Sequence, residues 1–161
     1  MNVSDRDRAG RTPLHYAVGD DPVGLNYTAA LTDEALAEEN FRTANAYKIA
    51  NTTRLLAEGA DVNAADLEGL TPLHAAASRD SVDVARLLLD AGADINAADD
   101  RGETALYKAV RNTTGGKLPI TELLLERGAD PHIPTANGSS AVKYVQRLGT
   151  PELRELFAEY L

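Results

Sequence analysis

The side chains best suited to chemistry in this sequence are its three histidines, His15, His74 and His132. A histidine can act as a general base near neutral pH or bind a metal ion through a ring nitrogen. Two of them, however, stand in the same phrase, because residues 10–18 read GRTPLHYAV and residues 69–77 read GLTPLHAAA. A histidine that recurs with its surroundings occurs once per structural unit and does not converge on one site. The spacing therefore favours a structural role for these two histidines.

A group of carboxylates is the second candidate for chemistry. The segment DEALAEEN contains Asp33, Glu34, Glu38 and Glu39. A pair of carboxylates can perform acid–base catalysis, but a charged run of this kind is more typical of a solvated helix face. The chain has no cysteine, and the motifs of P-loop proteins, zinc proteases and serine hydrolases are absent. We expect a protein that is not an enzyme and uses no metal or cofactor.

The overall composition narrows the classes of partner and the location. The net charge of −9 argues against nucleic acid, whose binding needs a basic surface. No apolar run approaches the roughly 18 residues of a membrane span, and the start MNVSDRDRAG does not resemble a signal peptide. With the lack of cysteine, these features predict a cytoplasmic protein that binds no membrane. Arginine outnumbers lysine 12 to 4, which favours a bacterial gene of high GC content.

The repeated phrase belongs to a longer periodic unit. Gly69 and Gly102 are 33 residues apart, and so are Gly59 and Gly92, each of which opens a G-A-D block. A third such block begins at Gly128. The unit reads D-x-x-G-x-T-P-L-H-x-A-A and continues into a second apolar segment such as VDVARLLLDAGADIN. A period of this length is the signature of a solenoid or another stacked architecture.

Each unit predicts two short helices. A threonine that can cap the first helix precedes it, a proline follows at the first helical position, and a glycine ends the second helix. The threonines are Thr12, Thr71 and Thr104, the prolines are Pro13 and Pro72, and the glycines are Gly59, Gly92 and Gly128. Two short helices cannot bury their apolar faces alone, whereas stacked units can.

These motifs resemble the ankyrin repeat, which has the same length and the same T-P-L-H-x-A phrase. The resemblance implies an all-α fold, an ankyrin-repeat α-solenoid of helix–turn–helix units with short β-turn fingers. We expect a single domain over residues 1–161, with repeats at about 5–63, 64–98, 99–133 and 134–161. The fourth repeat is degenerate, and its charged outer face is typical of a terminal capping repeat.

The resemblance also implies a role for the histidines. His15 and His74 match the family position that forms hydrogen bonds within the turn and towards the neighbouring repeat. Tyr107 and Lys143 occupy that position in the third and fourth repeats. His132 lies in the GADPH block, where we expect it to be another residue of a turn.

Two units contain extra residues between their helices. The first repeat carries about 26, at residues 19–46, and the third carries three, near NTTGGKL at residues 112–118. The large insertion begins as a loop, and a long helix is expected from Thr32 onwards. A stripe on that helix could comprise Ala35, Leu36, Ala46 and Ile49. The insertion could fold back as an N-terminal cap or form a lip that binds a partner, and both interpretations stay open.

Ankyrin proteins bind partners through their turn tips and the exposed side of their first helices, and the repeat phase assigns those positions here. The candidate partner-binding residues are Arg8, Arg11, Leu67, Glu68, Leu70, Ser78, Arg79, Asp100, Arg101, Glu103, Arg111 and Asn112. Arginine is concentrated among them, so we expect a locally basic groove on an acidic molecule. The insertion has the opposite charge, with six acids against Arg42.

These features favour a non-enzymatic module for protein–protein interaction. Its partner is expected to be another protein, bound through the concave groove and turn tips, with the 19–46 insertion as an additional candidate surface. The chain resembles bacterial ankyrin proteins, some of which act as immunity or inhibitor partners of toxins and enzymes. The alternatives are an enzyme or enzyme subunit with a site formed by the insertion, and a receptor that binds a peptide or small ligand in the groove.

Overall fold

The computed structural model describes residues 2–112 and 118–161. Over these ranges the chain is helical, and its one β feature is an isolated antiparallel bridge between Ala98 and Thr104. The helices are α1 (Pro13–Gly19), α2 (Tyr27–Ala30), α3 (Glu34–Ala57), α4 (Pro72–Ser78), α5 (Val82–Asp90), α6 (Ala105–Asn112), α7 (Pro119–Glu126), α8 (Ala141–Leu148) and α9 (Pro151–Leu156). The expected all-α solenoid is confirmed.

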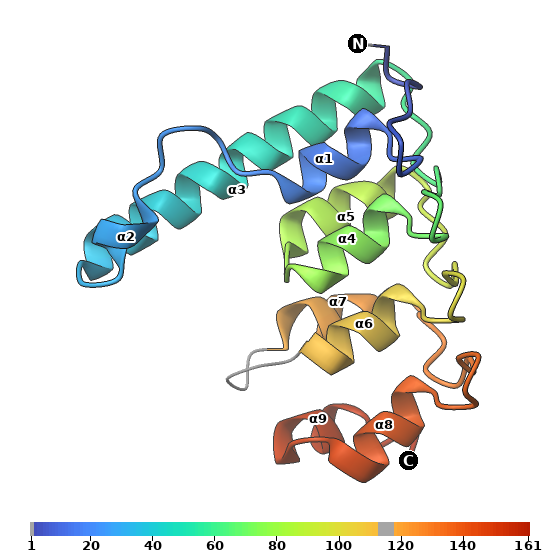
Figure 1. Cartoon of the computed structure of the whole chain (residues 1–161). Coiled ribbons are helices and arrows are strands. Elements are labelled where there is room, and N and C mark those ends of the chain that lie inside the picture. The colour runs from blue at the N-terminus through green and yellow to red at the C-terminus, as the bar shows by residue number, and fades with distance from the viewer. Residues whose placement is uncertain (1, 113–117) are drawn as a thin grey trace.

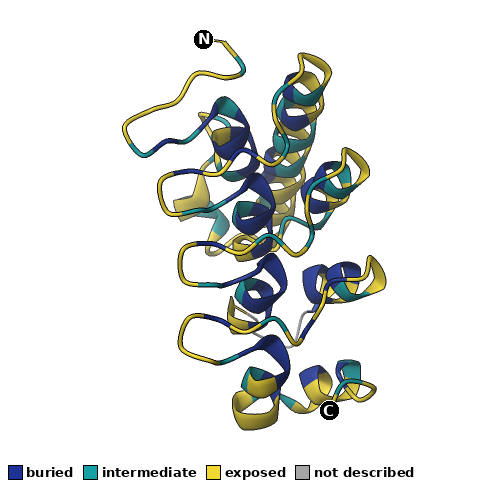
Figure 2. Ribbon diagram, turned by 90° about the vertical axis from the view of Figure 1, so that its right-hand side faces the viewer, coloured by how far each residue is buried: buried dark blue, intermediate teal, exposed yellow. Residues whose placement is uncertain are grey.

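The helices stack in two columns (Figures 1 and 2). The first helices of the repeats, α1, α4, α6 and α8, form one column, and α3, α5, α7 and α9 form the other. The leucine of the repeated phrase points into the core between the columns, and Leu14, Leu73 and Leu106 are at most 1% exposed. Because the same position is buried in successive units, one apolar core continues through the stack.

The phrase T-P-L-H begins a helix for a local reason. Thr71 is the N-cap of α4 with an extended backbone, and Pro72 takes the first helical position, where a missing N–H leaves no hydrogen bond unmade. The backbone N–H of Thr71 donates to Nδ1 of His74 at 3.1 Å. Thr12 and His15 repeat this arrangement at the start of α1. The N-caps expected from the sequence are therefore confirmed at both positions.

Glycines end the second helices. Gly59, Gly92 and Gly128 follow α3, α5 and α7 with φ between 86° and 90°, a left-handed conformation that a residue with a Cβ rarely adopts. The chain then runs to the next unit through an extended segment that ends in a tight turn, here called a finger. The fingers all project from the same side of the stack (Figure 2). Their tips lie at residues 7–10, 66–69, 99–102 and 135–138.

The large insertion forms a projection that we call the arm, defined as residues 20–43. It contains α2 and the first turns of α3, and it extends beyond the repeats on the side away from the fingers (Figure 1). The rest of α3 packs against α1 and α5 as the second helix of the first repeat. The arm thus continues α3 past the stack instead of lying over α1.

Details of the insertion differ from the sequence expectation. The expected loop contains the short helix α2, and the long helix begins at Glu34, with Asp33 as its N-cap. Ala35 and Ala46, expected in the apolar stripe, are exposed. The buried residues of α3 are Asn40, Ala44, Thr52 and Leu55. The expected extra residues of the third repeat lie almost wholly at 113–117, outside the described residues.

Candidate protein-interaction surface

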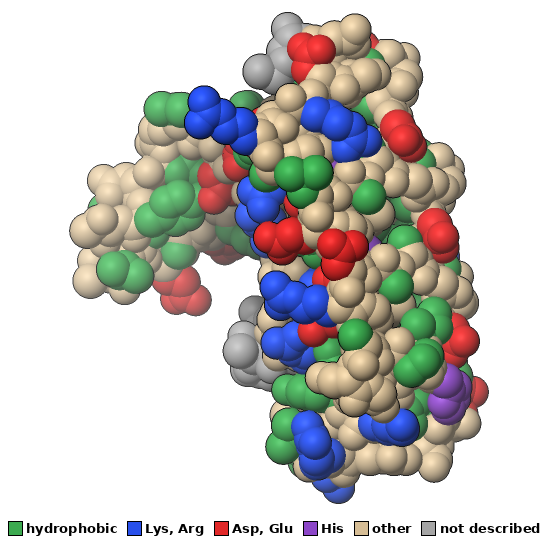
Figure 3. Space-filling view, turned by 45° about the vertical axis from the view of Figure 1, so that its right-hand side comes forward, with side chains coloured by type: hydrophobic (Ala, Val, Ile, Leu, Met, Phe, Trp, Pro, Cys, Tyr) green, Lys and Arg blue, Asp and Glu red, His purple; other side chains and the backbone are tan. Residues whose placement is uncertain are grey.

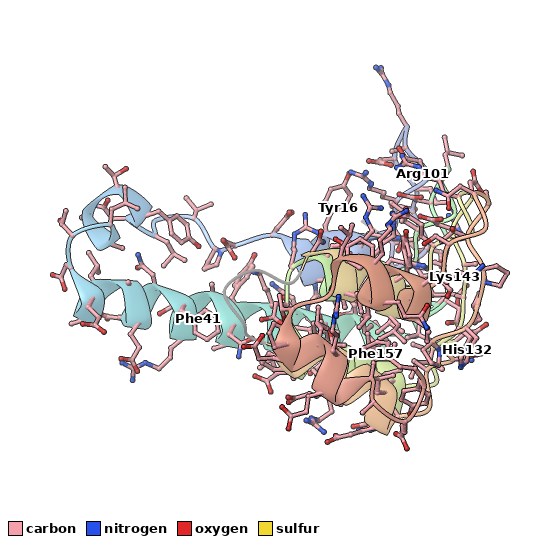
Figure 4. All side chains as sticks on the ribbon, turned by 90° about the horizontal axis from the view of Figure 1, so that it is seen from below. Tyr16, Phe41, Arg101, His132, Lys143 and Phe157 are labelled. Atoms are coloured by element: carbon pink, nitrogen blue, oxygen red, sulfur yellow. The ribbon has the colours of Figure 1, made fainter. Side chains whose placement is uncertain are left out.

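The fingers and the exposed sides of the first helices line one face of the molecule, which we call the groove. Figure 3 shows lysine and arginine side chains along this face, with carboxylates among them. Figure 4 places Arg101 at the finger end of the molecule and Phe41 far from it, on the arm. The groove and the arm are therefore two separate surfaces.

An aspartate side chain stabilises the turn of each of the first three fingers by accepting two backbone hydrogen bonds. Oδ1 of Asp99 accepts hydrogen bonds from the backbone N–H groups of Arg101 and Glu103, both at 2.9 Å. Asp66 and Asp7 make the same pair of bonds in their own fingers. Burial raises the pKa of Asp99, but hydrogen bonds from Lys108 and the two backbone groups outweigh it and lower the pKa overall. An ionised aspartate therefore fixes the shape of each of these fingers.

Neighbouring fingers are joined by backbone hydrogen bonds. The N–H of Asp100 donates to the carbonyl oxygen of Glu68 at 3.0 Å, and that of Leu67 donates to Ala9 at 2.8 Å. Gly69 permits this approach, because it has φ +78° and a Cβ there would lie 2.9 Å from the backbone nitrogen of Asp100. The finger tips thus form one connected row that holds their side chains at fixed spacing.

The repeated histidines strengthen the same row. Nδ1 of His74 accepts from the backbone of Thr71, so Nε2 carries the proton and donates to the carbonyl oxygen of Glu103 at 3.0 Å. His15 makes the equivalent bond to Leu70 at 2.8 Å. His74 is 1% exposed, and burial lowers its pKa. Both histidines connect one repeat to the next, as a structural role requires.

Most candidate binding residues lie on the surface of the groove. Leu67 is 73% exposed at a finger tip. The other candidates that are exposed are Arg8, Glu68, Ser78, Arg79, Asp100, Arg101, Arg111 and Asn112. The side chain of Asn112 donates to the carbonyl oxygen of Ser78 at 3.3 Å, so these two residues connect the ends of α6 and α4.

Three of the candidates are less available to a partner than the sequence suggested. Glu103, expected as an exposed tip, is 8% exposed because its side chain turns towards α6. Leu70 is half-buried, and its carbonyl oxygen accepts from His15. Arg11 is also half-buried, with its Nε 3.3 Å from a carboxylate oxygen of Asp66. The contacts of these three residues are made within the protein and help to hold the fingers in place.

A cluster of charges at α6 went unrecognised in the sequence. Nζ of Lys108 lies 2.7 Å from Asp99 and 2.9 Å from Glu103, and Nη1 of Arg111 lies 2.5 Å from Glu103. Burial lowers the pKa of Lys108, but its bonds to the two carboxylates outweigh this and raise it. The finger aspartate of the repeated unit was a usable signal, whereas the pairing with Lys108 depends on the fold. The basic character of the groove is partly neutralised here.

Arg79 and Arg101 keep their charges available. Neither guanidinium forms an ion pair within residues 2–112 and 118–161. Arg79 packs across the end of α1, since a Cβ on Gly19 would lie 2.9 Å from its guanidinium carbon. It lines a pocket of about 240 Å³ together with Tyr16 and Lys108. The pocket gives the groove a depression with an unpaired cation at its edge.

Other kinds of site are not visible in the described part of the chain. It contains no cluster of three or more histidine and carboxylate side chains positioned to hold a metal ion. His132 lies in a turn, where its N–H donates to Asp130 at 2.8 Å and its ring contacts Tyr160. None of the helices in the described ranges has the length and apolar character needed to cross a bilayer.

Comparison with known proteins agrees with this architecture. A family model of three ankyrin repeats matches residues 41–135. A protein of Equus caballus, "Ankyrin repeat, SAM and basic leucine zipper domain-containing protein 1", is 34% identical over 117 residues. The match covers 71% of this chain and only 25% of that relative. The matched repeats and the stacked helix pairs show that the chain belongs to the ankyrin repeat family, whose repeats generally form non-enzymatic modules that bind other proteins.

Proposed function

We propose that the protein binds a partner protein in the groove, with the tips of the second and third repeats as the centre of the interface. The observation that carries this proposal is an exposed apolar side chain, Leu67, on the same hydrogen-bonded row as Arg101, which has no ion pair within the part of the chain that the structure describes. Interfaces concentrate their binding energy in a few residues near the centre, where water is excluded, and arginine is frequent among them. An exposed large apolar side chain beside such a cation adds area that a partner can bury. The fixed spacing of the fingers reduces the entropy lost on binding.

The groove favours a partner with carboxylates on its docking surface. Arg79 and Arg101 can each pair with a carboxylate through two parallel hydrogen bonds. Arg111 contributes less than the sequence suggested, because Glu103 already holds it. The exposed acids Glu68 and Asp100 at the tips limit the attraction and add selectivity for partners that place a donor opposite them.

Charge reversal in the groove tests this proposal. A partner is first captured on the immobilised protein and identified, and its dissociation constant is then measured by calorimetry. The combination of Arg79→Glu and Arg101→Glu is expected to weaken binding by about 2 kcal/mol or more, which is about thirtyfold. Leu67→Asp is expected to weaken it further, because it removes the apolar anchor at the same row of tips.

Arg86 and Glu122 provide matched controls. Both are exposed, and they lie on the second helices α5 and α7, outside the groove. Arg86→Glu and Glu122→Lys are expected to change binding less than twofold. Losses at these controls as large as those at Arg79 and Arg101 would place the interface elsewhere and contradict the proposal.

The specific role that we propose is inhibition of a toxin or enzyme in the cytoplasm by occlusion of its surface. The resemblance to bacterial ankyrin proteins with immunity or inhibitor roles supports it. Co-expression with toxins encoded beside the gene is the direct test. Restored growth that depends on Arg79 and Arg101 is the expected result. Absence of any toxin or enzyme among the captured partners would contradict this role while leaving the binding module intact.

A further inference from the structure

The arm exposes large apolar side chains. Five of the nine exposed large hydrophobic residues of the described chain lie on the arm or just after it, with Val23, Tyr27, Leu31 and Phe41 on the arm and Tyr47 on the next turn of α3. Leu31 is 83% exposed and Phe41 70% exposed. Single exposed apolar residues are ordinary, but a concentration on one projection marks an interaction site.

Phe41 lies in a cleft between the arm and the repeats. The cleft has a volume of about 590 Å³, and Tyr27, Val82 and Pro119 add apolar surface to its walls. Its lining comes from the arm on one side and from the starts of α5 and α7 on the other. Figure 3 shows the hollow between the arm and the stack. The cleft therefore depends on both the insertion and the stacked repeats, because each supplies one of its walls.

The charge around Phe41 is negative. Residues 20–43 contain six carboxylates, with Arg42 as the one basic residue. Glu38 and Glu34 lie on the same face of α3 as Phe41, because residues three, four or seven apart share a helix face. Asp80 and Asp83 line the opposite wall of the cleft, where the side chain of Asn45 donates to Asp83 at 2.7 Å.

The basic side chains that line the cleft neutralise only part of this negative charge. Nζ of Lys48 lies 2.6 Å from a carboxylate oxygen of Asp21, which neutralises it. Arg79 lines both this cleft and the pocket of the groove. The cleft thus combines an apolar centre with Asp80 and Asp83 in its lining, while Glu34 and Glu38 lie on the arm beside it and outside the lining. Arg79 is its cation nearest the groove.

We propose that this cleft is a second docking surface, which takes a basic segment of a partner protein that carries a large apolar side chain. The apolar side chain packs against Phe41, and lysine or arginine residues around it face Glu34, Glu38 and Asp83. An acidic segment or an anionic membrane surface is repelled by the same carboxylates. The cleft shares Arg79 with the groove but is otherwise lined by other residues, and this inference does not rest on the function proposed for the groove.

A synthetic peptide provides the probe. It is a fluorescent 16-residue amphipathic helix of leucine, lysine and alanine with one central tryptophan, and binding to the full chain is measured by anisotropy. The intact protein is expected to bind it and not a version with glutamate in place of lysine. Phe41→Ala and Glu38→Lys are each expected to weaken binding at least about tenfold. Arg101→Glu, in the groove, is expected to leave binding unchanged.

Glu39 provides the decisive control. It is exposed next to Glu38 and carries the same charge, but it is two residues from Phe41 and therefore faces another direction. Glu39→Lys is expected to change binding less than twofold. Equal losses from Glu38→Lys and Glu39→Lys would show unspecific attraction and overturn the proposal. No binding of the basic peptide, or dimerisation of the chain that Phe41→Ala abolishes, would also overturn it.

Discussion

The repeats and the arm keep their shapes by different means. In the repeats, buried leucines, valines and alanines form a continuous core, and polar bonds join the fingers outside it. In the arm, large apolar side chains such as Leu31 and Phe41 are exposed, and polar contacts help to hold α2 to α3. The side chain of Asn40 donates to the carbonyl oxygen of Asn26 at 3.2 Å, and Asp21 binds both Lys48 and Tyr27.

This difference assigns folding stability to the core of the repeats and leaves the exposed side chains of the arm available for binding. The repeat core would be exposed to water only by unfolding, so its apolar residues contribute to stability. The largest exposed side chains of the arm, Leu31 and Phe41, contribute little to folding because they are already in contact with water. They therefore remain available for a partner, and their truncation tests binding with little effect on the fold.

The largest expected effect separates the two regions directly. Leu106→Ala removes a fully buried side chain from the stack and is expected to cost about 2–5 kcal/mol of unfolding free energy. Phe41→Ala removes a larger side chain from the arm and is expected to cost less than about 0.5 kcal/mol. Urea denaturation followed by circular dichroism measures both. Similar losses for the two variants would show that the arm shares the core.

The buried charges of the third repeat come next. Glu103→Gln removes the carboxylate that holds Lys108 and Arg111, and the expected cost is about 1.5–3 kcal/mol. The exposed pair between Asp90 and Arg127 is the comparison, and Asp90→Asn is expected to cost less than about 1 kcal/mol. A Glu103→Gln variant as stable as Asp90→Asn would refute the supporting role of the cluster.

The histidine between repeats is expected to have a similar or smaller effect, which depends on pH. His74→Ala leaves the carbonyl oxygen of Glu103 without its donor, at a cost of about 1–3 kcal/mol near pH 7. The folded state lowers the pKa of His74 below its ordinary 6.5 mainly through burial, which outweighs the hydrogen bond to the Glu103 backbone. Lys108 also lowers this pKa, and Asp99 raises it. The unfolded chain therefore binds the proton more readily, so this contribution is lost as pH falls below about 6.5.

Thermal denaturation at pH 7.5 and pH 5.5 measures this dependence. The intact protein is expected to lose more stability between the two values than His74→Ala does. Identical losses in both proteins would mean that His74 does not couple protonation to folding. Binding of a groove partner by the folded variant is expected to stay intact, since the side chain is buried below the surface.

The smallest expected effect is a difference in amide hydrogen exchange between the two ends of α3. Backbone amides of α3 between residues 36 and 42 belong to the arm, whereas those between residues 49 and 56 pack against the repeats. Because local opening is easiest where few apolar contacts are buried, the arm amides are expected to exchange with deuterium faster. Mass spectrometry of peptides from the two halves measures the rates. Equal protection along α3 would contradict the separation of arm and stack.

The sequence predicted the features of the fold that depend on a residue and its near neighbours in the chain. Thr71 and Pro72 begin a helix, and Gly92 ends one, because capping and backbone conformation depend on the residue itself and its near neighbours. The 33-residue period then predicts stacking, since each pair of helices needs a neighbour to bury its apolar face. The exposed positions of Leu67 and Arg101 followed from the same period.

The sequence predicted the exposure of some residues wrongly, because that exposure depends on contacts made in the folded structure. Glu103 has the same sequence position as other tip residues, but Lys108 and Arg111 attract its side chain inwards. Ala35 and Ala46 fit an apolar stripe by composition, yet the arm extends beyond the stack and leaves them exposed. A charge pattern read along the chain also overstated the basic groove, because it did not include the carboxylates that neutralise it.

The sequence by itself determined the repeat, the starts and ends of helices marked by its caps and glycines, and the family, because periodic apolar positions and caps act within one unit. Only the tertiary structure decided which charges are paired, with Arg111 bound to Glu103 and Arg79 without an ion pair among the described residues. It also decided the direction of the arm and the cleft that contains Phe41. The physical reason is that ion pairs and clefts form between residues distant in the chain, and their geometry follows from how the units pack.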